Sequence, residues 1–349
     1  MREIFESTIE RLLADTVTPE LLRGCDAGQW PQALWEAVEE SGFALAGAPE
    51  ALGGAGASWE DLVVIVRSLG RHAAPVPLAE AMLGNWLLGQ AGLEAAPGVL
   101  SIGAQGTLTL QEGRVSGELQ DVPWGRHAEH VVAVTGGPAP TVVLLSTASS
   151  SEHQLRLNTA GEPRDTLQWQ AVTPVASAPL PKHLQADVLW LGGALLRSAQ
   201  IAGAMHRALD LASQYATERV QFGKPIGNFQ SIQHQLAVMA EHTAASIIAA
   251  EAAFVQADGG LNAQAAWAIA AAKVCSAEAA GIGASTAHGV HGAIGFTHEH
   301  VLHLTTRRLW SWRSEYGTLS TWAQHLGQRA AQAGGAGLWP LITAMGTAE

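Results

Sequence analysis

The sequence predicts an α+β fold in which helices come first, a small β domain follows, and a longer helical part ends the chain. Residues 1–95 and 186–349 repeat apolar residues with spacings of three and four, which is typical of helices. Residues 96–185 alternate short apolar runs with turn residues, which is typical of an antiparallel sheet. Because 349 residues exceed what one small core organises, we expect three domains with these bounds.

Composition and charge restrict the class of protein. Hydrophobic residues make up 48% and charged residues 14%, which is typical of a globular chain. The net charge of −12 argues against nucleic acid as the main partner, because phosphate binding needs many basic groups. Cys25 and Cys275 are the two cysteines and lack metal-ligand spacing, so a reduced cytoplasm is expected. The N-terminus has no signal-peptide pattern, and no uninterrupted apolar run reaches membrane-spanning length.

The first 95 residues are predicted to form helices separated by glycine. Residues 30–42 place Leu34 and Val38 on one face and acidic residues on the other. Ser58 and Asp61 have the spacing of a helix cap, which predicts a further helix ending near Leu69.

The middle region contains five apolar or alternating runs that predict strands. Turn residues such as those of 136–138 and 161–163 separate them. The predicted strands are Val99–Ile102, Thr107–Leu110, His130–Val134, Thr141–Leu145 and Thr166–Val172.

The last part of the chain returns to helical periodicity. Apolar residues recur from Leu195 to Leu209 and again from Ile232 to Ile247. The run 244–280 is so rich in alanine that it predicts close approach of helices.

Two segments of this helical part carry a family resemblance. Residues 215–230, YATERVQFGKPIGNFQ, closely resemble the first signature of the acyl-CoA dehydrogenase family. Residues 291–299, HGAIGFTHE, resemble its second, glycine-rich signature. The resemblance implies an N-terminal helical domain, a middle antiparallel β domain and a C-terminal four-helix bundle, in agreement with the predicted α, β, α order.

The resemblance also implies a cofactor, FAD, between the β domain and the C-terminal helices, with its ADP part reaching a neighbouring subunit. A guanidinium such as that of Arg219 pairs well with a pyrophosphate, and Phe222 would pack on the nucleotide. The residues assigned to the cofactor in this way are Arg219, Gln221, Phe222, Gln230, Gly292 and Thr318. The second signature departs from the family pattern, because Gly289 stands where a Gln is usual and Ala293 replaces a glycine.

The catalytic base is the main departure. Desaturation of an acyl-CoA needs a carboxylate that removes the α-proton. One family position for this base falls on Tyr316 and the other on Gly193, and neither residue is an acid. Glu315 lies one residue early and is the candidate base, while Arg197 is a displaced candidate for the family's substrate-facing arginine.

Three hypotheses follow. The chain is a subunit of a heteromeric acyl-CoA dehydrogenase whose paralogous partner supplies the base, or a homo-oligomeric dehydrogenase that uses Glu315 or another carboxylate. Alternatively, it is a divergent relative, namely a scaffold subunit, a flavin oxidase or a monooxygenase. By the resemblance, an acyl-CoA is the substrate and electron-transfer flavoprotein the electron acceptor, in catabolism of fatty acids or steroid side chains.

Histidines and tryptophans are concentrated in and after the second signature. Five histidines fall within residues 288–303, but no zinc motif accompanies them, so a structural or interface role is predicted and no metal site. Trp310, Trp312 and Trp322 are predicted as core or subunit-interface aromatics, with binding of a CoA phosphate as the alternative. Trp124 occupies the β-domain segment that contacts the flavin ring in the family.

Overall fold

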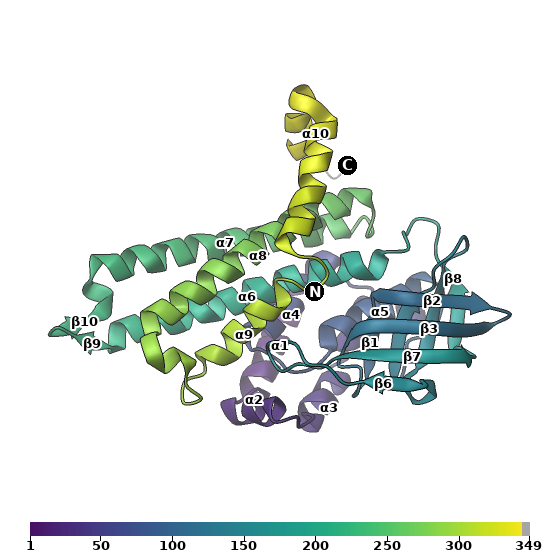
Figure 1. The fold of residues 1–349 in the computed structure, drawn as a ribbon, viewed down its shortest axis with the longest axis horizontal. Coiled ribbons are helices and arrows are strands. Elements are labelled where there is room, and N and C mark those ends of the chain that lie inside the picture. The colour runs from purple at the N-terminus through teal and green to yellow at the C-terminus, as the bar shows by residue number, and fades with distance from the viewer. Residues whose placement is uncertain (344–349) are drawn as a thin grey trace. The chain divides into compact units, whose positions relative to one another are not determined.

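The protein is described by a computed structural model, which covers residues 1–343 (Figure 1). It confirms the α+β class, with helices, then strands, then helices along the chain. The chain divides into two compact units, and each unit consists of three separate stretches of the sequence. The first unit contains Met1–Leu62, Pro75–Gly193 and Gly260–Asn262, and the second contains Val63–Ala74, Ala194–Gly259 and the chain from Ala263 onward.

The N-terminal helices begin and end at local sequence signals. The Thr18 side chain accepts a hydrogen bond from Leu21 N at 3.2 Å and so caps α2, and Ser58 Oγ accepts from Asp61 N at 3.1 Å at the start of α4. The capping prediction at Ser58 is therefore confirmed. The helices are α1 (Arg2–Thr16), α2 (Pro19–Asp26), α3 (Gln32–Glu40), α4 (Trp59–Arg71) and α5 (Leu78–Gln90), with 3-10 turns η1 (Phe43–Leu45) and η2 (Glu50–Leu52).

The β region of the first unit forms two four-stranded sheets. One has the order β1-β4-β5-β8, and the other, whose strands are neighbours in Figure 1, has the order β2-β3-β7-β6. Four of the five predicted runs lie entirely in strands, and the run Val99–Ile102 begins one residue before β1; β3, β6 and β8 were not predicted. The strands are β1 (Leu100–Gly103), β2 (Gln105–Gln111), β3 (Arg114–Pro123), β4 (His130–Val134), β5 (Thr141–Ser146), β6 (Glu152–Gln154), β7 (Arg164–Val172) and β8 (Ala176–Pro179), with the 3-10 turn η3 (Thr147–Ser149).

One strand pair corrects the expectation of a purely antiparallel domain. β1 pairs with β4 in parallel, with Leu100 opposite His130. Parallel neighbours need a crossover connection, and here the β2–β3 hairpin of the other sheet supplies it. The remaining pairs of these two sheets are antiparallel.

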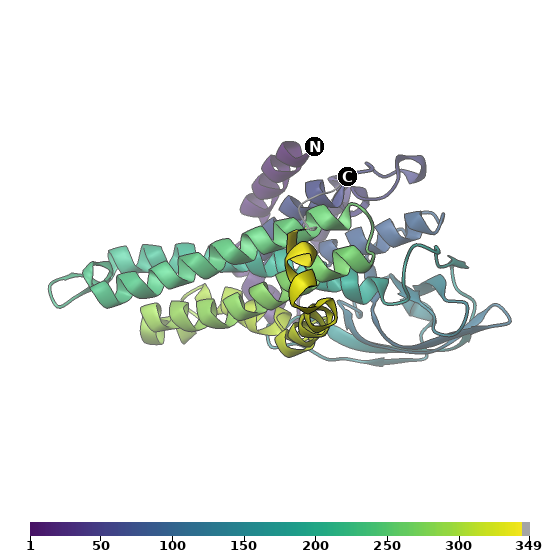
Figure 2. The ribbon, with the colours of Figure 1, turned by 90° about the horizontal axis from the view of Figure 1, so that it is seen from above.

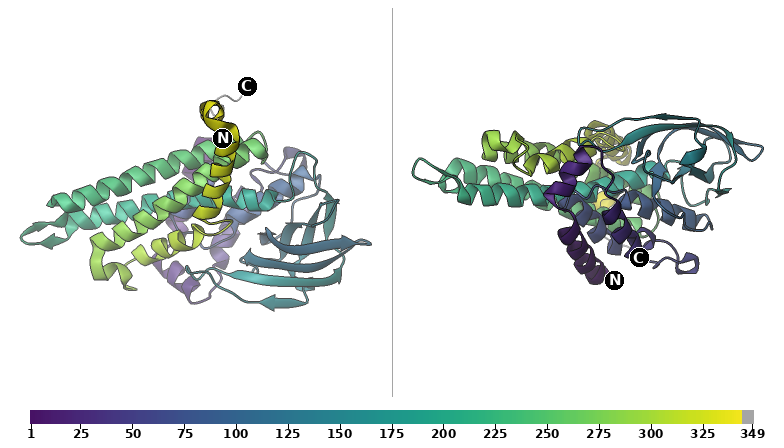
Figure 3. Two further views of the ribbon diagram at one scale, coloured as in Figure 1. Left: turned by 45° about the horizontal axis from the view of Figure 1, so that its top comes forward. Right: turned by 90° about the horizontal axis from the view of Figure 1, so that it is seen from below.

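The C-terminal helices belong mainly to the second unit. α7 and α8 lie side by side along most of their length, and α10 runs across α8 (Figures 2 and 3). A short hairpin of β9 (Val220–Gln221) and β10 (Lys224–Pro225) connects α6 to α7 through the 3-10 turn η4 (Ile226–Asn228). The helices are α6 (Val188–Glu218), α7 (Gln230–Ala257), α8 (Ala263–His291), α9 (Leu302–Trp312) and α10 (Leu319–Thr343), with the 3-10 turn η5 (Gly292–Phe296).

Small residues allow the helices of the second unit to approach closely. A Cβ added to Gly203 would lie 1.9 Å from the backbone oxygen of Arg67, and one added to Gly70 would lie 2.0 Å from that of Gln200. α4 and α6 are therefore in backbone contact, which any larger residue would prevent.

Three helices are long and apolar enough to cross a membrane by length and composition alone, which the sequence analysis did not anticipate. They differ in burial: 94% of the most apolar window of Val188–Glu218 is buried, against 61% for Ala263–Phe296 and 33% for Gln230–Ala257. The apolar character of the first of these helices is thus accounted for by packing inside the protein.

Candidate functional site

The first signature forms a hairpin that exposes an aromatic side chain. Phe222 and Gly223 make the turn between β9 and β10, with φ of 52° and 80°. This left-handed region is unfavourable for phenylalanine but not for glycine. Phe222 is also 92% exposed, so packing within the chain does not compensate for the strain. A strained and exposed aromatic residue indicates a contact with a molecule outside the chain.

Polar residues of the same signature surround the hairpin. Arg219, Gln221 and Gln230 are all exposed where α6 ends and α7 begins. Ile226 N donates to Arg219 O at 2.8 Å, and Lys224 Nζ lies 4.3 Å from the centre of the Phe229 ring. The predicted cofactor residues of this signature thus lie together on an accessible surface.

The two signatures meet at one cavity, although they are far apart in the sequence. The ends of α6 and α8 enclose about 530 Å³, lined by Tyr215, Glu218, Arg219, His291, Ala293 and Ile294. Gly292 lies between two of these lining residues and has a φ of 64°. The structure therefore brings Arg219 to the segment that carries Gly292.

Stacked rings form one wall of this cavity. The His291 ring lies 4.5 Å from that of Tyr215 at an angle of 25°, and 4.6 Å from that of His300. His291 Nδ1 contacts Ala287 O at 2.7 Å. Burial lowers the pKa of His291, against the effect of this hydrogen bond, so the ring is neutral at neutral pH. Within the described residues its Nε2 is buried and has no hydrogen-bond partner.

These groups are compatible with a pyrophosphate-bearing nucleotide such as FAD. The guanidinium of Arg219 suits a phosphate, and a neutral ring with an unpartnered nitrogen offers an acceptor to a hydroxyl or amino group. Glu218 also lines the cavity, and its negative charge would repel a nearby phosphate.

The structure joins the candidate base to the candidate substrate residue. Arg197 Nε donates to Glu315 Oε2 at 2.7 Å, and Arg197 Nη1 donates to Gln200 Oε1. The Arg197 side chain is 2% exposed and that of Glu315 is 16% exposed. The guanidinium also lies 5.5 Å from the centre of the Tyr316 ring. Both residues are thus committed to an internal ion pair.

The remaining predicted positions have structural roles within the chain. Tyr316 is buried in the loop between α9 and α10 with a φ of 53°, and Gly193 is buried on α6. Thr318 Oγ1 accepts from Thr321 N at 3.2 Å and so caps α10. Its assigned contact with a cofactor stays a prediction.

A residue that sequence reasoning missed lies beside this loop. Lys273 of α8 is fully buried, and its Nζ donates to Trp312 O at 2.9 Å and to Arg313 O at 3.1 Å. The one sequence signal was a single lysine in an alanine-rich run. Its partners lie about forty residues later in the chain, so no local pattern could identify them.

Three of the five clustered histidines, His288, His291 and His303, are buried, whereas His298 is exposed. His288 stacks between Phe296 and Trp310, with ring centres 4.0 and 5.4 Å away, and its Nε2 lies 2.8 Å from Thr306 Oγ1. In residues 1–343, no group of three or more His, Cys, Asp or Glu side chains could hold a metal ion.

The tryptophans singled out by the sequence are mostly core residues. Trp312 and Trp322 are 2% and 1% exposed. In the first unit, Trp124 is also buried, has a φ of 56°, and packs edge-on against Trp30 with ring centres 6.0 Å apart. Trp124 thus belongs to an aromatic cluster of the first unit.

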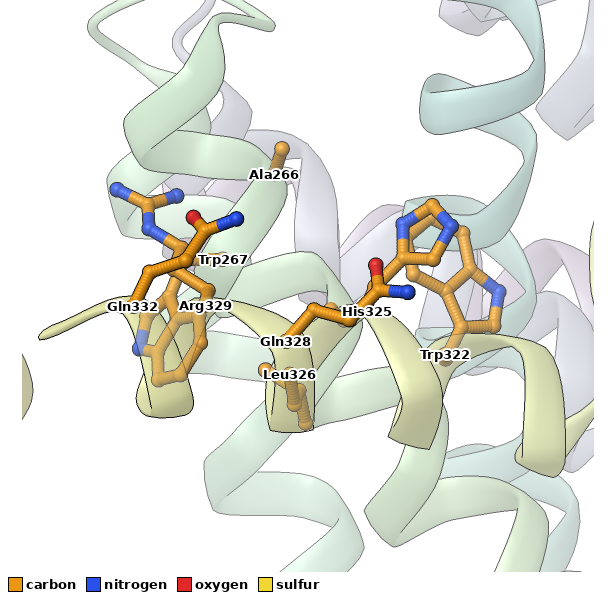
Figure 4. Close-up of a pocket in the computed structure, with 9 residues that line it drawn as sticks. Ala266, Trp267, Trp322, His325, Leu326, Gln328, Arg329 and Gln332 are labelled. Atoms are coloured by element: carbon orange, nitrogen blue, oxygen red, sulfur yellow. The ribbon is translucent and has the colours of Figure 1, made fainter. Parts of the chain in front are cut away.

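A second, smaller hollow lies between α8 and α10 (Figure 4). It holds about 260 Å³ and is lined by Trp267 and Trp322 together with polar residues of α10 such as His325 and Gln328. The Arg329 guanidinium lies 5.4 Å from the centre of the Trp267 ring and donates to Ala263 O at 2.8 Å. Arg329 thus has contacts within the chain on this side of the hollow.

Comparison with known proteins identifies the family to which these helices, sheets and signatures belong. The acyl-CoA dehydrogenase N-terminal domain matches residues 2–96, and the acyl-CoA dehydrogenase C-terminal domain matches residues 192–335. The chain belongs to the acyl-CoA dehydrogenase family, which confirms the resemblance, and its homologues are oxidoreductases of that type.

Individual relatives extend over nearly the whole chain. Acyl-CoA dehydrogenase IpdE2 of Mycobacterium tuberculosis is 31% identical over 315 residues, which cover 88% of this chain and 90% of IpdE2. Two similar solved structures are the ChsE4–ChsE5 complex of Mycobacterium tuberculosis (TM-score 0.83, 22% identity) and a variant of the Tcur3481–Tcur3483 steroid ACAD (TM-score 0.85, 24% identity). Each match covers 95% of this chain and 97% of the other chain, and each shows the shared fold.

Proposed function

We propose that this chain is a subunit of an FAD-dependent acyl-CoA dehydrogenase that desaturates an acyl-CoA thioester, and that a paralogous subunit supplies the catalytic base. The Arg197–Glu315 ion pair carries the proposal. Tyr316 and Gly193 have no carboxylate, and the acid next to Tyr316 is held by a buried guanidinium. A carboxylate in such a pair is a weaker proton acceptor than an unpaired buried one.

The chain's own contribution is the nucleotide-binding surface around Arg219. Arg219 would neutralise the pyrophosphate, Phe222 would pack on the nucleotide, and neutral His291 would accept a hydrogen bond. Gln221, Gln230, Gly292 and Thr318 complete the set assigned by the family resemblance. When bound, FAD accepts the hydride that leaves the β-carbon of the thioester. The exposure of Arg219 and Phe222 suits a cofactor that also contacts a second chain.

Relatives support a two-chain assembly. Both similar structures named above are known by two components, ChsE4 with ChsE5 and Tcur3481 with Tcur3483, and one is called a steroid ACAD. We extend this arrangement to the present chain, with a bulky acyl-CoA as substrate class, electron-transfer flavoprotein as electron acceptor, and the cytoplasm as location.

Co-expression with a paralogous acyl-CoA dehydrogenase that has an intact base tests the proposal. The chain purified alone should carry little flavin, whereas the co-purified complex should be yellow and lose its absorbance when an acyl-CoA is added without oxygen. A chain that binds FAD alone and is bleached by acyl-CoA would overturn the heteromeric proposal.

The Glu315→Gln variant separates the two enzyme hypotheses. If a partner supplies the base, bleaching of the complex continues at a rate within a few-fold of the unmodified complex. If Glu315 is the base, bleaching stops. Two further outcomes of the co-expression test are informative. If neither the chain alone nor the complex is coloured, the chain is a scaffold. A bound flavin that no acyl-CoA reduces would favour oxidase or monooxygenase chemistry.

A further inference from the structure

One buried lysine stands out within α8. Lys273 and Glu278 are the two residues of α8 that carry a formal charge, and Lys273 lies on its fully buried face among alanines. A buried ammonium without partners is strongly unfavourable. The groups around Lys273 must therefore account for its position.

Its direct partners are backbone oxygens at the end of α9. Lys273 Nζ donates to Trp312 O and Arg313 O, at 2.9 and 3.1 Å. The last carbonyls of a helix have no partner within that helix, and they lie at the negative end of its dipole. Lys273 thus caps α9 from a neighbouring helix.

Two other helices hold the loop that follows, which consists of residues 313–318. Arg197 of α6 binds Glu315, and Trp322 of α10 donates from Nε1 to Tyr316 O at 2.9 Å. Together with Lys273, these contacts secure a loop that contains the left-handed Tyr316. This is the loop on which the family's base position falls.

The charges in this cluster are unequal, with two cations for one carboxylate. Burial lowers the pKa of Lys273 to about 7; Glu315 opposes this shift and Arg197 adds to it. A neutral amine still has two N–H groups, which match the two carbonyls. The loop therefore stays anchored in either protonation state, while the charge beside Glu315 changes.

Three charged residues of the other elements packed against α8 are engaged elsewhere. Glu251 of α7 binds Arg67 at 2.8 Å, Arg308 of α9 donates to Leu304 O at 2.8 Å, and Arg329 of α10 binds Ala263 O. The charged groups that act on Lys273 are thus Glu315 and Arg197.

We propose that Lys273 is a positioning residue that anchors the 313–318 loop and, with Arg197, keeps Glu315 as an internal counter-ion. Glu315 is then unavailable to accept a proton from a substrate, so the base comes from another chain. This consequence for catalysis rests on the proposed function, whereas the anchoring does not.

The low lysine content permits a direct test. The chain has three lysines, and Lys182 and Lys224 are exposed. In a protein labelled with ¹³C at lysine Cε, we expect three NMR signals, of which that of Lys273 titrates near pH 7. Lys273→Met should remove the signal that titrates near pH 7. Lys273→Arg should remove it as well, and it is used for the assignment if the methionine variant does not fold.

Neighbouring substitutions give shifts of opposite sign. Glu315→Gln should move the midpoint of Lys273 to lower pH, because it removes a negative charge, and Arg197→Met should move it to higher pH. A Lys273 signal that does not titrate near pH 7, or whose midpoint responds to neither substitution, would overturn the proposal.

Hydrogen–deuterium exchange measures the anchoring itself. Lys273→Met should speed exchange at least several-fold in peptides spanning residues 312–322, while Lys182→Met, the same change at an exposed lysine, should not. Unchanged exchange in the Lys273 variant would contradict an anchoring role. Neither readout needs flavin, acyl-CoA or a partner, so failure of the proposed function would leave both results interpretable.

Discussion

Two regions of the second unit differ in whether their candidate functional residues are exposed or have partners within the chain. Around the β9–β10 hairpin, Arg219 and Phe222 are exposed, and Phe222 has an unfavourable backbone conformation. In the loop between α9 and α10, Glu315 and Tyr316 are held by side chains from two helices, α6 and α10. The first region, the open region, is accessible to another molecule. In the second, the closed region, the side chains have their partners within the chain.

The difference shows that residues of the first signature are accessible, whereas the neighbouring base position is occupied by side chains that pack and pair within the chain. A binding surface needs polar groups that lack partners inside the chain. Buried charges, in contrast, are stable only when such partners are present. The accessible surface around Arg219 and the internally paired Glu315 both agree with the proposed role of a subunit that completes another chain's site.

Breaking the closed region should have the largest effect. Arg197→Met removes one partner of a mostly buried ion pair and should lower the free energy of unfolding by about 3 kcal/mol. The matched control is Arg156→Met, because Arg156 pairs with Asp121 at 3.5 Å on the surface, and such pairs contribute less than about 1 kcal/mol. Urea unfolding followed by circular dichroism measures both, and equal losses would show that the Arg197 pair is not special.

The second prediction concerns pH in the closed region. The folded-state pKa of Lys273 is lowered from 10.5 to about 7, so between these values the unfolded chain holds a proton that the folded chain lacks. Stability therefore rises with pH in this window, relative to Lys273→Met, by about 1.4 kcal/mol per pH unit at most. From pH 7 to about pH 9, the unmodified protein should gain about 2 kcal/mol on the variant in urea unfolding. A difference that does not depend on pH would rule out titration of this lysine.

The third prediction addresses the open region. Arg219→Ala should weaken flavin binding by the complex by about 2 kcal/mol, or about thirty-fold, because it removes a charge-assisted contact to phosphate. Quenching of flavin fluorescence on titration of the apo-complex measures the affinity. Arg23→Ala, which alters an exposed arginine of α2, should leave it unchanged. Equal affinities for the Arg219 variant and the control would remove Arg219 from the site.

The smallest effect is expected at the hairpin turn. Phe222→Gly should raise the free energy of unfolding by about 0.5–1 kcal/mol, since glycine adopts the left-handed region without strain. The same change should weaken flavin binding, because the exposed ring is lost. Thermal unfolding and the fluorescence titration report the two effects. A variant that binds flavin normally would reduce Phe222 to a turn residue.

Local features of the sequence predicted most of the fold. Five strands, the cap at Ser58 and the two helices around Leu195 and Ile232 follow from periodicity and turn residues, which act over a few positions. β3 escaped prediction because Gly117 and polar residues interrupt its alternation, and its pairing with β7 shifts register twice. Its partners on both sides, rather than its own pattern, make it a strand.

The sequence by itself determined the family, the first signature at residues 215–230 and the absence of an acid at Tyr316 and Gly193, since each depends on residue identity at known spacing. Tertiary structure alone decided what became of Glu315. Its partner Arg197 is 118 residues away, and the Lys273 amine that caps α9 comes from a third helix. Such contacts depend on how helices pack, because burial makes an unpaired charge unfavourable and thereby selects partners that no local pattern specifies.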